Sequence, residues 1–149
     1  MAARLRVLVA IFAVALSTPY SAQAREDQTV WSGLLIASNS LPSEPTPAEV
    51  ARIEGTLRQL FGYSRIQLIG EARQKLHTSQ EDWEAKSKYF ALDVDARGEK
   101  AGAYVLNLKL FQGEKLLLET DARLNKASPL VIRGPQVGDG QLVIVLVVE

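Results

Sequence analysis

Residues 140–149 read GQLVIVLVVE, and this stretch decides the fold. Every position from Leu142 to Val148 is apolar. A strand with one face in water should alternate apolar and polar side chains, whereas a strand covered on both faces reads as a continuous apolar run. We therefore predict that this last strand lies inside the domain with a layer of protein against each face.

The two faces of this strand carry different side chains, because successive residues of a strand point in opposite directions. One face comprises Leu142, Ile144, Leu146 and Val148, and the other comprises Val143, Val145 and Val147. We expect the first strand of the domain and the region around Trp83 to cover the valine face. If that face were bare, Trp83, Val143, Val145 and Val147 would form an interaction surface, because an uncovered apolar strand tends to associate.

One amphipathic helix is predicted at about residues 47–61. Thr46 is placed to cap it, Pro47 suits its first position, and Glu49 completes a capping box. Gly62 suits the left-handed position that ends a helix. The apolar stripe that must pack on another layer consists of Val50, Ile53, Leu57, Leu60 and Phe61.

Most of the remaining chain has the period of two that is typical of strands with one buried face. Such alternation runs through residues 66–73, 90–97, 104–111 and 116–124, with Ile69, Val105 and Phe111 as apolar exceptions at polar positions. Shorter strands are predicted at 30–36 and 129–133. Residues 97–100, 112–114 and 138–140 contain glycine and predict turns, whereas the polar residues 77–88 predict a loop or a bulged strand end.

These elements predict the α+β class, with the helix packed on a curled antiparallel sheet of five to six strands in the order β-α-β-β-β-β(-β). A small β-sandwich with one helix is the alternative. The element order resembles that of the cystatin-like fold, but the Gln-x-Val-x-Gly motif of the cystatin inhibitors is absent. The inhibitory activity is therefore not expected here.

Three longer stretches carry a second resemblance. They are LFGYSRIQLIG at 60–70, YVLNLKLFQGEKLLLETDARL at 104–124 and SPLVIRGPQVGDGQLVIVLVV at 128–148. Together they resemble a family of small exported bacterial β-rich proteins that carry no assigned activity. The sequence features that carry this resemblance are helix ends and turns, so the resemblance implies a fold but no functional site.

The first 24 residues predict a secretory signal peptide. Arg4 and Arg6 precede a ten-residue apolar segment, and Ala22-Gln23-Ala24 provides a small-x-small cleavage site. We expect cleavage to leave a single domain at 25–149 that is exported, periplasmic or secreted, and soluble. No later apolar run reaches the roughly 20 residues that a membrane-spanning helix needs, so no stable membrane span is expected after cleavage.

Composition argues against several functions. The chain has 17 basic and 17 acidic residues, and removal of Arg4 and Arg6 gives a net charge of about −2. That balance provides no drive toward nucleic acid. The chain contains no cysteine, which removes thiol nucleophiles and thiolate metal sites. We expect no cofactor and no metal.

Three side chains are candidates for catalysis. His77 is the only histidine, so it is the only imidazole base, and it lies in a polar stretch without a catalytic motif. Asp93 and Asp95 should lie about 7 Å apart on one strand face, where paired carboxylates can perform acid–base chemistry. The simpler interpretation is a solvated strand face, with Lys109, Glu119 and Asp121 as cross-strand charge partners.

The sequence therefore favours a non-enzymatic exported module that interacts with another envelope protein or with itself. One alternative is a small secreted hydrolase using His77, Asp93 or Asp95. Another is a protein that binds a small apolar ligand between the helix and the sheet.

Overall fold

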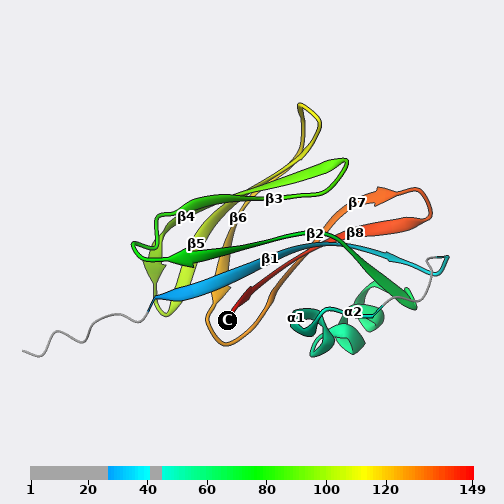
Figure 1. Ribbon diagram of the computed structural model, residues 1–149, viewed down its shortest axis with the longest axis horizontal. Helices are drawn as coiled ribbons and strands as arrows, with labels where there is room; N and C mark the ends of the chain where they lie inside the picture. Colours follow the sequence, from blue (N-terminus) through cyan, green and yellow to red (C-terminus); the bar gives the residue numbers. More distant parts are fainter. Residues whose placement is uncertain (1–26, 41–44) are drawn as a thin grey trace, which may run out of the picture.

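The computed structural model describes residues 27–40 and 45–149, so the predicted signal peptide lies outside the described residues. Two short helices and eight strands follow one another along the chain (Figure 1). Their bounds are β1 Gln28–Ser38, α1 Ala48–Ala51, α2 Glu54–Phe61, β2 Arg65–Leu76, β3 Asp82–Lys86, β4 Phe90–Lys100, β5 Ala103–Gln112, β6 Lys115–Asn125, β7 Leu130–Val137 and β8 Gly140–Val148. No helix among the described residues is long and apolar enough to cross a membrane.

The strands form two four-stranded antiparallel sheets. The first sheet has the order β2-β1-β8-β7, and the second has the order β3-β4-β5-β6. The sheets face one another, and the helices lie against the first sheet on its far side from the second (Figure 1). The expected single curled sheet with five to six strands is therefore wrong, and the sandwich alternative is closer to the observed fold. The reason is that β1 pairs with both β2 and β8, which separates these strands from the meander of β3 to β6.

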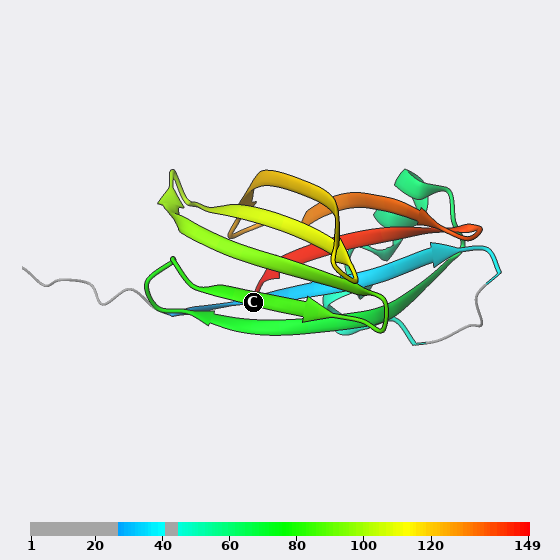
Figure 2. The ribbon, with the colours of Figure 1, turned by 90° about the horizontal axis from the view of Figure 1, so that it is seen from above.

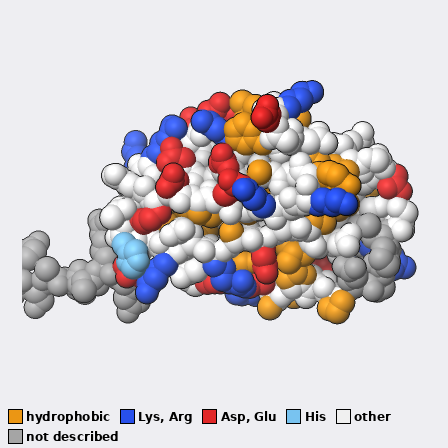
Figure 3. All heavy atoms as spheres, turned by 45° about the horizontal axis from the view of Figure 1, so that its top comes forward, with side chains coloured by type: hydrophobic (Ala, Val, Ile, Leu, Met, Phe, Trp, Pro, Cys, Tyr) orange, Lys and Arg blue, Asp and Glu red, His pale blue; other side chains and the backbone are white. Residues whose placement is uncertain are grey.

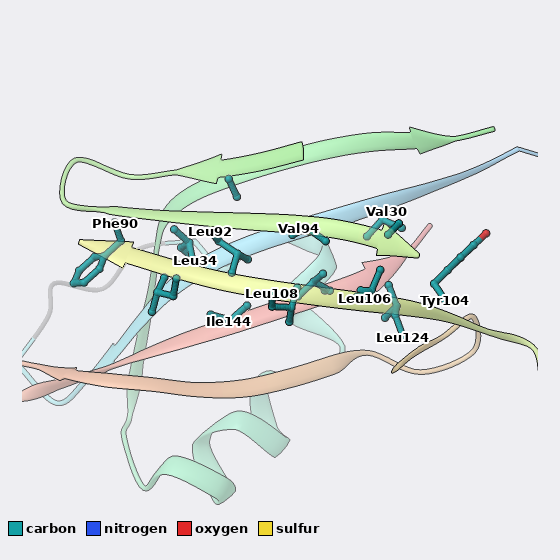
Figure 4. Close-up of a cluster of buried hydrophobic side chains, with 14 of the residues drawn as sticks. Val30, Leu34, Phe90, Leu92, Val94, Tyr104, Leu106, Leu108, Leu124 and Ile144 are labelled. Carbon is teal, nitrogen blue, oxygen red and sulfur yellow. The ribbon is translucent and has the colours of Figure 1, made fainter. Parts of the chain in front are cut away.

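The main core fills the space between the two sheets. From the first sheet it receives one face of β1 and β8, and from the second sheet it receives the apolar positions of β4 and β5 (Figure 4). The fully buried side chains there include Leu34, Leu92, Leu106, Leu108, Leu142 and Ile144. Burial of a leucine or isoleucine side chain contributes about 1.5–3 kcal/mol, so this layer supplies most of the driving force for joining the sheets.

A second core lies between the first sheet and the helices. Val143 and Val145 of β8 are buried there together with Val50 and Leu57 of the helices. The prediction that β8 is covered on both faces is confirmed. The predicted cover of the valine face was wrong, because Trp83 packs instead against the core between the sheets and β1 lies beside β8 in the same sheet.

The helical segment differs from its prediction in two ways. It is two helices, with a break at Arg52 and Ile53. The first begins at Ala48, and its N-cap residue is Pro47 and not Thr46, so no side chain caps it. Glu49 forms an ion pair with Arg73 of β2, so it is not available for a capping box. Leu60, expected in the buried stripe, is 59% exposed. Gly62 adopts the expected left-handed conformation, with φ of 71°.

Ile69 breaks the alternation of β2 because the β1–β2 register shifts at Leu34/Leu35. Before the shift, Ile66 and Leu68 face the helices, and after it Ala72 and Leu76 face the second sheet. Gly70 follows the shift at a close approach of backbones, since a Cβ there would lie 2.2 Å from the Lys86 carbonyl oxygen. The bulge and the glycine together bring β2 against the end of β3, which closes this edge of the sandwich.

Two of the three predicted turns are confirmed and one is displaced. Gly113 and Gly138 have positive φ in the β5–β6 and β7–β8 turns. The turn expected at 97–100 lies instead at Ala101 and Gly102, with φ of 53° and 79°. Gly98 belongs to a register shift within β4, where an extra residue is accommodated without ending the strand.

Candidate interaction surface

The outer face of the second sheet is not covered by either helix. In Figure 2, which views the molecule from the side of this sheet, no helix lies in front of β4 and β5. On the face shown in Figure 3, acidic and basic side chains are interspersed with hydrophobic patches. This outer face of the second sheet is the surface on which the predicted site residues Asp93 and Asp95 lie.

The strand register arranges the outer side chains in rows across the sheet. One row is Glu84, Asp93, Lys109 and Glu119, and the next is Asp82, Asp95, Asn107 and Asp121. The two rows therefore hold six carboxylates and one lysine. We call these eight residues the acidic rows.

Hydrogen bonds and ion pairs connect the acidic rows. Asn107 is only 5% exposed, and its Nδ2 donates to Asp121 Oδ1 at 2.9 Å and to Glu119 Oε1 at 3.4 Å. Arg97 Nε lies 3.3 Å from Asp95 Oδ2, and Arg97 Nη1 lies 3.8 Å from Asp121 Oδ1. A hollow of about 450 Å³ opens between the rows over β3, β4 and β5, with Asp93 and Asp95 in its wall.

An apolar row lies beside the acidic rows, toward the β5–β6 turn. The register aligns Ala91, Phe111 and Leu116 across β4, β5 and β6, and Lys86 of β3 ends the row. Leu116 is 44% exposed, and the adjacent Tyr89 is 63% exposed. A second hollow, of about 480 Å³, is lined by Tyr89, Phe111, Glu84 and Asp93 among others, so it shares both carboxylates with the first hollow.

His77 is not among the residues that line either hollow. It follows the end of β2, its ring is exposed, and its Nδ1 lies 2.8 Å from Asp27 Oδ2. The structure thus brings Asp93 and Asp95 together on one face and places the imidazole in the β2–β3 loop, in contact with a different carboxylate.

The β2–β3 loop is organised by Glu81. Its carboxylate accepts hydrogen bonds from the backbone amides of His77 and Thr78, and from Thr78 Oγ1 at 2.7 Å. Desolvation of this carboxylate acts to raise its pKa, but the hydrogen bonds from Thr78, His77 and Gln80 lower the pKa to about 2. The polar stretch 77–88, predicted as a loop or a bulged strand end, is therefore a structured turn that leads into the short strand β3.

The other predicted surface residues are directed inward. Trp83 lies on β3, packs on the core between the sheets, and donates from Nε1 to Ser32 Oγ at 2.9 Å. Val143 and Val145 are buried under the helices, and Val147 is partly buried in the same cluster. Val143 and Val145 are therefore not available for the interaction surface expected on these four residues, whereas Trp83 and Val147 are half-buried, and Trp83 also lines the hollow between the acidic rows.

Metal binding finds no support in the arrangement of the titratable groups. Within residues 27–40 and 45–149, no three or more His, Asp or Glu side chains are grouped so that they could hold a metal ion. Three carboxylates of the acidic rows instead form ion pairs within the protein, Glu84 with Lys86 and both Asp95 and Asp121 with Arg97.

No protein-family model, curated protein or solved structure matches this chain.

Reasoning from sequence missed Tyr89 and the apolar row. The available signal was the broken alternation at Phe111, an apolar residue at a position where the alternation of its own strand predicts a polar one. Tyr89 gave no such signal, because it lies in the β3–β4 turn, where periodicity does not apply.

Proposed function

We propose that this protein is a non-enzymatic, exported binding module that holds a partner protein on the outer face of its second sheet. The observation that carries this proposal is the apolar row beside the acidic rows on a face without a helical cover. A sheet face that served only for solubility would place polar side chains at Phe111 and Leu116 as well.

The chemistry of the face defines the partner that fits it. Exposed Tyr89 in the β3–β4 turn, with Phe111 on β5 and exposed Leu116 on β6, provides an apolar and aromatic anchor of the kind that is common at protein interfaces. The adjacent six carboxylates outnumber the cations Lys109, Lys86 and Arg97 beside them, so this face favours basic side chains on the partner through charge complementarity. We infer a partner segment in which an apolar residue is flanked by lysine or arginine.

The alternative of a hydrolase gains little from the arrangement. A catalytic acid–base pair needs its groups within hydrogen-bond reach of one substrate atom. His77 contacts Asp27, and it does not line the hollow that contains Asp93 and Asp95. The binding function therefore accounts for more of the geometry.

Site-specific photo-crosslinking tests the proposal. A photoreactive residue at position 116 should give one discrete adduct in extracts of the host, whereas the same residue at position 60 should give none. Leu60 is a matched control because it is also an exposed leucine but lies on the helical layer. An adduct of twice the mass of the chain would identify the partner as a second copy.

The specificity of that adduct is checked by competition. Unlabelled wild-type protein should abolish it, and Phe111→Ser or Asp93→Lys protein should compete at least tenfold less well. Raising the salt concentration from 0.05 M to 0.5 M should weaken the adduct, because the charges are exposed. Equal labelling at positions 60 and 116, or equal competition by the variants, would contradict the proposal.

A further inference from the structure

A third hollow lies at the end of the sandwich, between the β3–β4 turn and strands β1 and β2. Its volume is about 340 Å³. The walls are mostly apolar and include Ile36, Leu68, Ile69, Tyr89, Phe90 and Val137. The hollow is separate from the acidic rows, since none of their eight residues lines it.

The floor of this hollow belongs to the core between the sheets. Ile36, Ile69 and Val137 are partly buried and pack against that core, and Phe90 is one of its buried members. Ile69 reaches this position through the register shift between β1 and β2, which adds one residue to β2 beside the hollow. An apolar group in the hollow would therefore contact the main core directly, and its burial would be favourable because it removes apolar surface from water.

The charge of the hollow contrasts with that of the outer face. Among the described residues, no carboxylate lines the hollow, and the only charged side chain in its lining is Lys88. The Lys88 ammonium lies 5.3 Å from the centroid of the Tyr89 ring, so the positive charge stands at the exposed rim. If a ligand places an apolar tail in the hollow, the polar end of that ligand would therefore lie near the Lys88 ammonium, where the hollow opens to solvent.

We propose that this hollow binds a single-chain anionic amphiphile, with the alkyl chain against Ile36, Ile69 and Phe90 and the carboxylate of the ligand at Lys88. The volume lies near the lower limit of the roughly 300–1,000 Å³ that is usual for ligand sites, which fits one alkyl chain of medium length. This site is placed between the two sheets at their open end. The alternative of an apolar ligand between the helices and the first sheet would instead use the smaller hollow of about 290 Å³ lined by Arg52, Ile53 and Val147.

The proposal is tested by calorimetric titration of the protein with decanoate below its micelle concentration. We expect saturable binding at one site. Decyltrimethylammonium, which has the same chain length and the opposite charge, should bind at least tenfold more weakly, and so should butyrate, which keeps the carboxylate but shortens the chain.

Two variants locate the site. Lys88→Glu should weaken decanoate binding at least tenfold, whereas Lys100→Glu, an exposed lysine at the end of β4, should change it less than twofold. Val137→Trp should fill the hollow and abolish binding, with its fold verified by circular dichroism and melting. Phe111→Ser should leave decanoate binding unchanged, because Phe111 belongs to the apolar row and does not line this hollow.

The proposal would be overturned by any of three results. The first is the absence of saturable heat with decanoate, the second is equal affinity for the cationic amphiphile, and the third is unchanged binding by folded Lys88→Glu protein. This hollow shares Lys88, Tyr89 and Phe90 with the hollow beside the apolar row, so Phe111→Ser, which should impair the protein-binding face alone, distinguishes failure of the ligand site from failure of the proposed function.

Discussion

The outer faces of the two sheets are built from strands of different pattern. On the first sheet, β8 presents Val143 and Val145 to the helices, and both are buried. On the second sheet, β4 presents Asp93 and Asp95 to solvent at the equivalent alternate positions. The difference teaches that the sequence pattern of a strand indicates how many of its faces are covered. A strand without alternation lies between two layers of protein, and an alternating strand is covered on one face only.

A carboxylate introduced on the outer face of each sheet gives the largest expected difference. Val145→Asp would place a carboxylate without a partner beneath the helices, which should destabilise the protein by about 4 kcal/mol or more and prevent stable folding. Val105→Asp, on the outer face of the second sheet opposite Arg123, should cost less than about 1 kcal/mol. Urea unfolding followed by circular dichroism measures both. Similar losses for the two variants would break the distinction between the faces.

Truncation of helix residues measures how firmly the first sheet is covered. Leu57→Ala should destabilise by about 3 kcal/mol, because Leu57 is buried against the valine face and its loss leaves a cavity. Leu60→Ala should change stability by less than about 0.5 kcal/mol, since Leu60 is exposed. If the two variants melted at the same temperature, the helical layer would not be packed as described.

Two glycine substitutions sharpen the comparison at the edge where the sheets meet. Gly70→Ala should destabilise by about 2 kcal/mol, because its Cβ would collide with the Lys86 backbone and force β2 away from β3. Gly55→Ala has open space around its Cβ in α2 and should stabilise by about 0.5–1 kcal/mol. Chemical denaturation of the two variants should thus give shifts of opposite sign, and a neutral Gly70→Ala would show that the edge is loose.

The smallest effect concerns the β2–β3 loop and is visible as a dependence on pH. Because the folded pKa of Glu81 is about 2 against an ordinary 4.5, its charged form stabilises the native state above pH 4.5, and this stabilisation is lost as the pH falls toward 2. Glu81→Gln should lower stability at pH 7 by at most about 1 kcal/mol, since the group is exposed and screened. The difference between the variant and the wild type should vanish near pH 2. A difference that stayed constant from pH 7 to pH 2 would assign the effect to packing and not to charge.

Local patterns in the sequence predicted the elements that depend on neighbouring residues. The alternation along 90–97, 104–111 and 116–124 appears as β4, β5 and β6, and Gly62 ends the helical segment as expected. The uninterrupted apolar run of β8 predicted two covered faces, and both are present. These features share one property, which is that a few adjacent residues suffice to define them.

The partition into two sheets could not be predicted in the same way. It depends on β1 pairing with β2 on one side and with β8 on the other, and that choice joins residues more than 100 positions apart. β3 was missed because it has five residues, of which only Trp83 and Ala85 face inward within a polar stretch. The break at Arg52 and Ile53 likewise follows from packing, since the apolar spacing alone favours one continuous helix.

For the candidate surface, periodicity placed Asp93 and Asp95 on one face and aligned Lys109 with Asp93 and Glu119. It could not reveal the hollows, because these arise from turns and from the spacing of two layers. Tyr89 contributes to two hollows from a turn, where the direction of a side chain is set by the fold and not by a repeat.

The place of β8 in the middle of the first sheet has a consequence for the order of folding. The meander of β3 to β6 joins strands that are adjacent in the chain, so it can form with little loss of loop entropy. In the first sheet, β1 and β7 are connected only through β8, the nine-residue strand that comes last in the chain, so this sheet cannot be completed before β8 pairs. We therefore expect the second sheet to form early and the first sheet to close last, so that a chain shortened before residue 140 would remain unfolded in half of its structure.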